Sequence, residues 1–380
     1  MDDTPNQKLK ISFLLARADL SGGVRVIATY ADLLRKLGHE VLVVSRPARP
    51  PTLRERLRHS IRGTPIPADA RPEPNHIDYR GVPHRVIDAH RPIFASDLPD
   101  ADVVIATWWE TAEWAADLPP QKGSGVFFIQ HYEAHQSIPT DRVDAAWRLP
   151  MRKIVIAQWL AELARTRFGD ASSLLVPNSV DLEQFALPPR GKQPVPTVGL
   201  MYSTAAFKGC DISLRAVELA RKTIPQLRLV AFGSTDPTPD LPLPENTLFV
   251  RQPAQEFLKH LYGQCDAWLF GSRSEGFGLP LLEAMASRTP VIATRAGAAP
   301  ELLGGEQEGL GWLVPLQDSA AMAERIVQVC RMSDPQWRSM SDNVCRAVRR
   351  YTQQDAVTRF ESALFGVVRD ASDRRVREAA

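Results

Sequence analysis

The chain has 380 residues, of which 44% are hydrophobic and 24% charged, and its formal net charge is +2. A chain of this length is too long for one ordinary hydrophobic core, so two domains are expected. The balanced charge gives no electrostatic case for a nucleic-acid-binding protein. No apolar run approaches the roughly 18 residues that a membrane-spanning helix needs.

Neither a secretion signal nor a metal or disulfide framework is predicted. The N-terminus starts acidic, and the apolar run 11–16 is short, which fits a buried strand better than a signal peptide. The four cysteines have no paired spacing and no nearby histidine partner: Cys210, Cys265, Cys330 and Cys345. We expect reduced core thiols in a cytoplasmic protein.

The first half of the chain alternates strands and helices. Residues 10–15 predict a strand, 24–38 a helix that stops at Gly38, and 40–45 a second strand. This order is a βαβ unit and predicts a buried parallel sheet. Further strands are expected at 76–81, 83–88, 101–107, 125–130, 153–158 and 172–178.

A proline-rich stretch separates this half from a second set of strands and helices. Residues 188–196 are expected to be a linker between a domain at 1–187 and a domain at 197–350. The second domain should contain strands at 197–202, 227–233, 247–252, 267–272, 290–294 and 311–315. The fold class is therefore α/β, with two doubly wound Rossmann-like domains that face each other across a cleft.

Residues 272–294, "SRSEGFGLPLLEAMASRTPVIAT", place two glutamates on either side of a glycine-rich turn that opens a helix. The glycines let backbone approach a ligand, and the amides of Leu281, Leu282 and the preceding turn should form an anion site. Glu275 and Glu283 would repel a phosphate there, so we expect them to point past it at hydroxyl groups. A simpler interpretation is that they only favour the helix start, by up to about 1 kcal/mol.

The segment "EGFGLPLLEAMA", followed by "TPVIATRAGAAPELL", closely resembles the donor-site signature of retaining GT-B glycosyltransferases of family 4. The resemblance extends to "VPNSVDLEQF", "KGCDISLRAVELA" and "SGGVRV", and so covers most of the chain. It implies that Glu275 binds hydroxyls of the donor sugar and Glu283 those of the ribose. It also implies a final helix at 351–380 that returns to the first domain, and backbone contacts to sugar and phosphate from Gly276, Phe277, Gly278 and Leu279.

One position departs from the family pattern. The family pairs an arginine after the first strand of the second domain with a lysine before a glycine, and the two neutralise the diphosphate. Lys208 matches the lysine, but Leu200 stands at the arginine position, with Tyr202 and Ser203 as the nearest polar substitutes. One positive charge is therefore missing where stabilisation of the leaving phosphate matters most.

Several residues of the first domain are candidates for the same reaction. Gly22 and Gly23 follow the first strand and open a helix, where amides meet a phosphate or an acceptor, although a simple tight turn has the same sequence. His131 ends a strand; the resemblance implies a place beside the donor sugar and assistance to the transfer, and a hydrogen-bonded cleft histidine is the alternative. Acceptor binding is assigned to the aromatic residues Trp108, Trp109 and Tyr132, with core packing as the alternative for the two indoles.

Residues 52–63 place leucine and isoleucine at helical spacing with four arginines elsewhere around the helix. A basic amphipathic helix is typical of a peripheral contact with anionic lipid, and a solvated surface helix has a similar pattern.

These observations predict a metal-independent, retaining glycosyltransferase with His131, Glu275 and Lys208 as its catalytic residues. It would move a hexose or deoxyhexose from a nucleoside diphosphate sugar to a hydroxyl of a glycan or lipid-linked acceptor, without a cofactor. The resemblance suggests surface-polysaccharide biosynthesis as its setting, in the cytoplasm or at the inner face of the membrane. Two alternatives stay open, a non-catalytic sugar-nucleotide-binding subunit and a GT-B nucleotide-sugar epimerase; no residue names the base, the sugar or the acceptor.

Overall fold

The computed structural model describes residues 7–61, 75–134, 138–304 and 309–379 and divides into two compact units. The first unit contains the chain up to Ile156, Leu160–Val176 and the segment from Val357; the second contains Ala157–Trp159 and Pro177–Ala356. The stretch 188–196 belongs to the second unit. There the Arg190 guanidinium donates hydrogen bonds to the Cys265 carbonyl at 2.6 Å and to Thr289 Oγ1 at 2.9 Å.

The first unit is built on a seven-stranded sheet with the order β3-β2-β1-β4-β5-β6-β7, and every pair of neighbours is parallel. Ile11 lies opposite both Val41 and Val103, so the centre of the sheet is lined by buried aliphatic side chains. Such runs favour a sheet covered on both faces. The strands are β1 Lys10–Leu15, β2 Glu40–Ser45, β3 His84–Val86, β4 Val103–Ala106, β5 Ser124–Ile129, β6 Arg152–Val155 and β7 Leu174–Leu175.

The expected strand at 76–81 is wrong. His76–Tyr79 is the short helix α3, and the Asn75 side chain caps it by accepting hydrogen bonds from the amides of Ile77 and Asp78. An asparagine cap offers the backbone this alternative to a strand. Only β3 remains of the expected strand pair, and it lies parallel to β2.

The second unit has a six-stranded parallel sheet with the order β10-β9-β8-β11-β12-β13. Its core contains the fully buried aromatic residues Tyr202, Tyr262, Trp268 and Trp337. The strands are β8 Thr197–Tyr202, β9 Arg228–Gly233, β10 Thr247–Arg251, β11 Ala267–Phe270, β12 Val291–Thr294 and β13 Gly311–Val314. The α/β class and the two doubly wound domains are thus confirmed.

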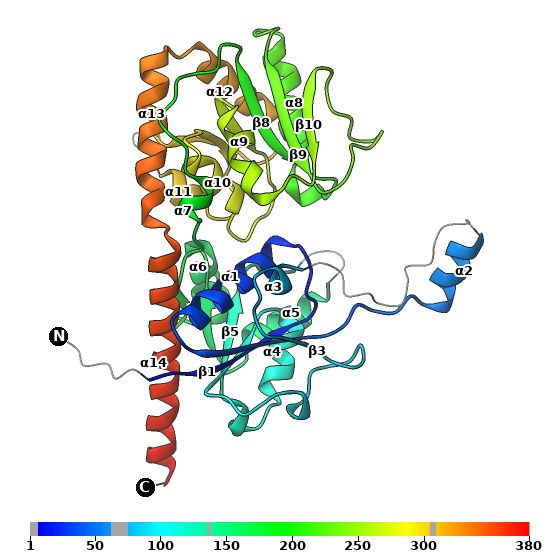
Figure 1. Cartoon of the computed structure of the whole chain (residues 1–380), viewed down its shortest axis with the longest axis vertical. Helices are drawn as coiled ribbons and strands as arrows, with labels where there is room; N and C mark the ends of the chain where they lie inside the picture. The colour runs from blue at the N-terminus through cyan, green and yellow to red at the C-terminus, as the bar shows by residue number, and fades with distance from the viewer. Residues whose placement is uncertain (1–6, 62–74, 135–137, 305–308, 380) are drawn as a thin grey trace, which may run out of the picture. The chain divides into compact units, whose positions relative to one another are not determined.

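Helices cover the two sheets (Figure 1). Those before the second sheet are α1 Gly22–Lys36, α2 Leu53–Ile61, α3, α4 Trp109–Ala116, α5 Thr140–Trp147, α6 Gln158–Phe168 and α7 Leu182–Phe185. Those after β8 are α8 Cys210–Arg221, α9 Leu258–Gly263, α10 Leu279–Ala286, α11 Ala299–Leu303, α12 Ser319–Arg331, α13 Asp334–Ala347 and α14 Gln353–Ala379. Single turns of 3-10 helix stand at η1 Ala95–Asp97, η2 Pro120–Lys122, η3 Ala206–Lys208, η4 Gln255–Phe257 and η6 Val348–Arg350.

The last helix, α14, packs on the first unit from Val357 onward. The Phe360 ring lies 4.5 Å from the Tyr30 ring and 5.0 Å from the Phe128 ring, measured between centroids. His39 Nε2 and Glu361 Oε1 add a hydrogen bond of 2.8 Å. This aromatic cluster fixes the helix against α1 and β5.

Among the helices of the described part, none is both long and apolar enough to span a membrane.

Candidate functional site

In the sheet of the second unit, the order in which the strands are added reverses between β8 and β11, and this place is the switch point of the sheet. The chain leaves these neighbouring strands in opposite directions, and ligands of open parallel sheets bind beyond the carboxyl ends at such a point. Lys208 comes shortly after β8, and Glu275 shortly after β11. The strand order therefore places the two predicted catalytic residues of this unit at one edge of the sheet.

Lys208 and Glu275 form an ion pair at that edge. Lys208 Nζ lies 2.7 Å from Glu275 Oε1, and the two side chains are 25% and 10% exposed. Ser272 Oγ donates a second hydrogen bond of 3.0 Å to the same carboxylate oxygen. Low exposure strengthens a charge-assisted pair of this kind and fixes the direction of both side chains.

Gly209 sets the position of Lys208. Its φ of +56° is left-handed, and a Cβ there would lie 1.9 Å from the Gly271 carbonyl oxygen, so a side chain fits neither the conformation nor the space. The close backbone approach places the turn before α8 directly against the end of β11. The Arg273 amide then donates to the Phe207 carbonyl at 2.8 Å, which holds the two segments together.

The turn into α10 has the form expected of an anion site. Gly278 has φ +102° and caps the helix, and a Cβ there would lie 2.9 Å from the Phe270 ring. Within the described residues, the amides of Gly276, Phe277, Gly278 and Leu279 make no hydrogen bond. The expected role of the Leu281 amide is wrong, because it donates to the Gly278 carbonyl at 2.9 Å. The amides of the turn itself, rather than that of Leu281, are therefore available to an anion.

Glu283 lies in α10 and is buried, with only 4% of the residue exposed. Its Oε2 accepts a hydrogen bond of 2.7 Å from the Tyr262 hydroxyl of α9. The tyrosine thereby orients the second carboxylate of the motif from inside the unit.

The three residues considered in place of the missing arginine differ in their surroundings. Leu200 lies inside β8 and is buried in the core. The Tyr202 hydroxyl is also engaged: it donates to the Leu241 carbonyl at 2.8 Å and accepts from the Thr238 amide at 2.9 Å. Ser203 is the first side chain beyond the strand, and only it of the three stands at the edge.

Other cations of this edge are arginines. Arg273 is paired with Asp211 through two hydrogen bonds, of 2.9 and 2.7 Å. Arg295 follows β12 directly, is exposed, and has no ion pair among the residues that the structure describes. Gly297, two residues later, packs against Glu275, so Arg295 enters the same loop cluster.

The first unit has its switch point between β1 and β4. Gly22 and Gly23 begin α1 after β1, and the Gln130 side chain donates from the end of β5 to the Gly23 carbonyl at 3.2 Å. His131 follows Gln130 and is half-buried. The candidate glycines and the candidate histidine thus stand at one edge of this sheet.

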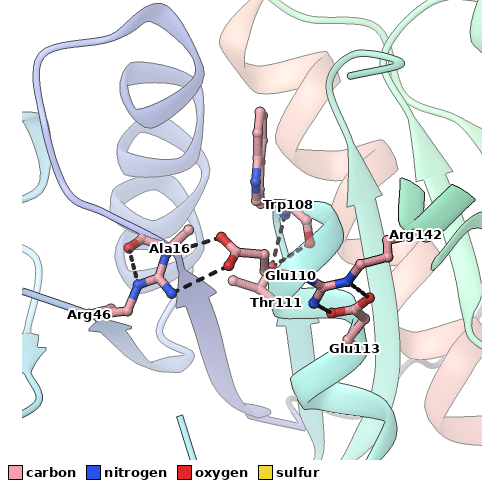
Figure 2. A network of polar contacts seen from close by, with 7 residues as sticks. All are labelled: Ala16, Arg46, Trp108, Glu110, Thr111, Glu113 and Arg142. Atoms are coloured by element: carbon pink, nitrogen blue, oxygen red, sulfur yellow. Dashed lines mark hydrogen bonds and ion pairs between the residues drawn. The ribbon is translucent and has the colours of Figure 1, made fainter. Parts of the chain in front are cut away.

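Trp108 stands at the same edge as the N-cap residue of α4 and is half-buried. Arg46 from the end of β2 reaches Glu110 with hydrogen bonds of 3.4 and 3.0 Å, and its Nε donates to the Ala16 carbonyl at the end of β1 (Figure 2). The guanidinium also lies 5.0 Å from the centre of the Trp114 ring. An indole, a guanidinium and a carboxylate at a switch point form a surface suited to a polyhydroxylated ligand.

Helix α4 carries a second glutamate in an ion pair with an arginine, Glu113, three residues after Glu110. Arg142 of α5 donates to both Glu113 oxygens at 3.1 and 2.6 Å (Figure 2). Its guanidinium also lies 4.4 Å from the centre of the Trp109 ring. Trp109 is only 6% exposed, which makes it a core residue in this unit rather than a stacking surface.

Tyr132 also belongs to a packed cluster. Its ring contacts the rings of Trp147 and Phe168, and its hydroxyl donates to Asp144 Oδ1 at 2.7 Å. Burial, together with the Asp144 carboxylate, raises the pKa of Tyr132 to about 12. Its hydroxyl is therefore engaged within the unit.

The sequence patterns did not identify four polar residues of these candidate sites: Ser272, Arg46, Glu110 and Glu133. Ser272 lies inside the recognised motif, so its position three residues before Glu275 could have indicated a hydrogen bond between the two side chains. Arg46 and Glu110 are 64 positions apart, and no local pattern joins them. Glu133, beside the candidate histidine segment, is 4% exposed, and burial raises its pKa well above the ordinary range, which favours the neutral acid.

No group of three or more histidine, cysteine, aspartate or glutamate side chains in the described ranges has the arrangement of a metal site.

Residues 194–332, which contain the switch point of the second unit, match the family described as Glycosyl transferases group 1. The match lies within the second unit and covers less than half of the chain. The N-acetyl-alpha-D-glucosaminyl L-malate synthase of Bacillus anthracis is 28% identical over 138 residues, 36% of this chain and 35% of that protein. The D-inositol 3-phosphate glycosyltransferase of Saccharomonospora viridis is 30% identical over 181 residues, 43% of this chain and 40% of that protein. The matches therefore span less than half of these curated relatives.

Solved structures resemble nearly the whole chain. Anabaena HepE, solved with UDP-glucose, has a TM-score of 0.73 at 17% identity and covers 94% of this chain and 100% of its own. Sucrose-phosphate synthase from Thermosynechococcus elongatus has a TM-score of 0.70 at 19% identity, over 98% and 100%. At these identities the likeness establishes the fold, which is that of GT-B glycosyltransferases.

Proposed function

We propose that this protein is a retaining, metal-independent glycosyltransferase that moves a hexose or deoxyhexose from a nucleoside diphosphate sugar to a hydroxyl of a glycan or lipid-linked acceptor. The observation that carries the proposal is the Lys208–Glu275 ion pair, 2.7 Å long, at the switch point of the second unit. A cation, a carboxylate and an amide-lined turn stand together there. These are the groups that a diphosphate joined to a sugar requires.

In this proposal the second unit binds the donor. The amides of Gly276–Leu279 and the Lys208 ammonium neutralise the diphosphate, while Glu275 accepts hydrogen bonds from sugar hydroxyls and Glu283 from the ribose. Arg295 supplies the positive charge that is missing where Leu200 replaces the family's arginine. Two similar proteins support a nucleotide-sugar donor: the relative from Saccharomonospora viridis is named a glycosyltransferase, and HepE was solved with UDP-glucose.

The transfer itself needs little covalent chemistry from the protein. The bond between the anomeric carbon and the phosphate oxygen breaks, the acceptor oxygen bonds to that carbon on the same face, and the acceptor proton passes to the departing phosphate. The charge that develops on that phosphate is stabilised by fixed donors, which is the largest catalytic contribution in many enzymes. His131 keeps the assisting role that the family resemblance implies.

The first unit binds the acceptor in this proposal. The Trp108 ring offers a stacking face, and the Arg46–Glu110 pair offers both a donor and an acceptor of hydrogen bonds. A sugar ring has one apolar face and hydroxyls around its edge, which such a surface complements.

Hydrolysis of the donor without an acceptor tests the proposal. Incubation with UDP-, dTDP- and GDP-sugars should release free sugar from one of them, and NMR should show that the first-formed sugar keeps the donor's anomeric configuration. The absence of the family's arginine, where Leu200 stands, favours one competing function, a non-catalytic sugar-nucleotide-binding subunit. Binding of a nucleotide sugar with no hydrolysis and no transfer to any acceptor in a panel of alkyl hexosides would support that competitor instead.

A further inference from the structure

Helix α2, blue in Figure 1, carries three exposed aliphatic side chains. Leu53, Leu57 and Ile61 recur every fourth residue and are 85%, 62% and 78% exposed. Residues with this spacing share one face of a helix. Single exposed aliphatic residues are ordinary on protein surfaces, but three in one continuous stripe mark a surface that contacts something else.

Exposed arginines line both edges of this stripe. At about 100° per residue, Arg54 and Arg58 lie on one side of it and Arg56 on the other. The nine residues Leu53–Ile61 contain three arginines and one glutamate, so the helix is basic. Arginine side chains are long enough to keep their charge in the headgroup layer while neighbouring aliphatic side chains enter the acyl region. The remaining two residues of the expected 52–63 segment, 62 and 63, lie outside the described residues.

We propose that α2 docks in the plane of an anionic membrane surface, with Leu53, Leu57 and Ile61 inserted and the arginines on lipid phosphates. Charge complementarity favours an anionic membrane as the partner of this basic helix. An anionic bilayer offers an apolar layer for the stripe and negative groups along both of its edges at once. The inference goes beyond the proposed function and does not depend on it, because lipid binding is measured without donor or acceptor.

Sedimentation of the full chain with vesicles tests this docking. The protein should sediment with vesicles of phosphatidylcholine and phosphatidylglycerol, and much less with phosphatidylcholine alone. Arg54→Gln combined with Arg58→Gln should weaken partitioning about 25-fold, since each arginine near an anionic surface contributes about fivefold. Leu57→Ser should weaken it about tenfold by removing one inserted side chain.

The matched control is Arg165→Gln combined with Arg215→Gln. It changes the net charge equally, and both side chains are 60% exposed in ion pairs on other helices, α6 and α8. It should sediment nearly as the unchanged chain does. The proposal is overturned if the unchanged chain stays in solution with anionic vesicles, if the control loses as much binding as the α2 double variant, or if Leu57→Ser binds normally. All variants alter exposed side chains, and unchanged thermal midpoints would confirm that they fold.

Discussion

Glu275→Ala is expected to reduce the rate of transfer on the order of 1000-fold while nucleotide affinity stays unchanged or becomes tighter. Two charge-assisted hydrogen bonds to sugar hydroxyls, at roughly 2 kcal/mol each, account for this loss. The nucleotide should not be released, because the variant removes a negative charge beside the diphosphate and frees the Lys208 ammonium that Glu275 now holds at 2.7 Å. Donor turnover and calorimetric titration with the nucleoside diphosphate measure the two effects separately.

Asp211→Asn is the matched control for this variant. Asp211 is also a carboxylate in an ion pair of the same loop cluster, but its partner is Arg273 and its side chain is 53% exposed. Its loss should change turnover only a few-fold. A Glu275→Ala protein that transfers sugar within a few-fold of the unchanged enzyme, or that loses nucleotide binding instead, contradicts the role assigned to this carboxylate.

Glu110→Gln is expected to raise the KM for an acceptor about 10- to 100-fold and to leave donor hydrolysis unchanged. The variant weakens the charge pair with Arg46, at 3.0 Å, and removes a charged hydrogen-bond acceptor, an effect of about 1.5–3 kcal/mol. Alkyl hexosides serve as acceptor probes, and hydrolysis without acceptor reports on the donor site alone. A purely structural role would instead lower the thermal midpoint and affect both reactions together.

Glu113→Gln provides a closely matched comparison. Glu113 lies on the same helix and is 29% exposed against 24% for Glu110. It pairs with Arg142, whose guanidinium lies over an indole ring as that of Arg46 does. The two variants should cost similar stability, since each weakens one arginine–glutamate pair. Equal effects of both on the acceptor KM would contradict an acceptor site at Trp108 and Glu110.

Much of the fold could be predicted because its signals are local. Runs such as Val103–Ala106 and Val291–Thr294 are buried on both faces, and a continuous aliphatic run predicts a central parallel strand. The prediction of a strand at 76–81 was wrong for an equally local reason, because the Asn75 side chain caps a helix there. The hydrogen bond of one asparagine outweighed a weak preference for a strand.

The candidate site was predictable where one motif carries it. Glycine, proline and glutamate within Glu275–Glu283 predict a turn, a helix start and two carboxylates without any tertiary information. Burial is not local, which is why Tyr202 and Trp109 looked like binding residues, although one has an engaged hydroxyl and the other lies in the core. The Arg46–Glu110 pair depends on strands β2, β1 and β4 being neighbours, which only the topology establishes.

Calorimetric titration of UDP, dTDP and GDP, with and without EDTA, into the unchanged chain and into Lys208→Ala tests the central claim most directly. One nucleotide should bind in both the presence and the absence of EDTA, and Lys208→Ala should weaken its binding about 10- to 100-fold through the loss of one charged hydrogen bond. Arg215→Ala, an exposed cation on α8 away from the edge, should bind as the unchanged chain does. Failure of all three nucleotides to bind, or equal affinities of the unchanged chain and Lys208→Ala, would contradict a nucleotide-sugar donor site at the Lys208–Glu275 pair.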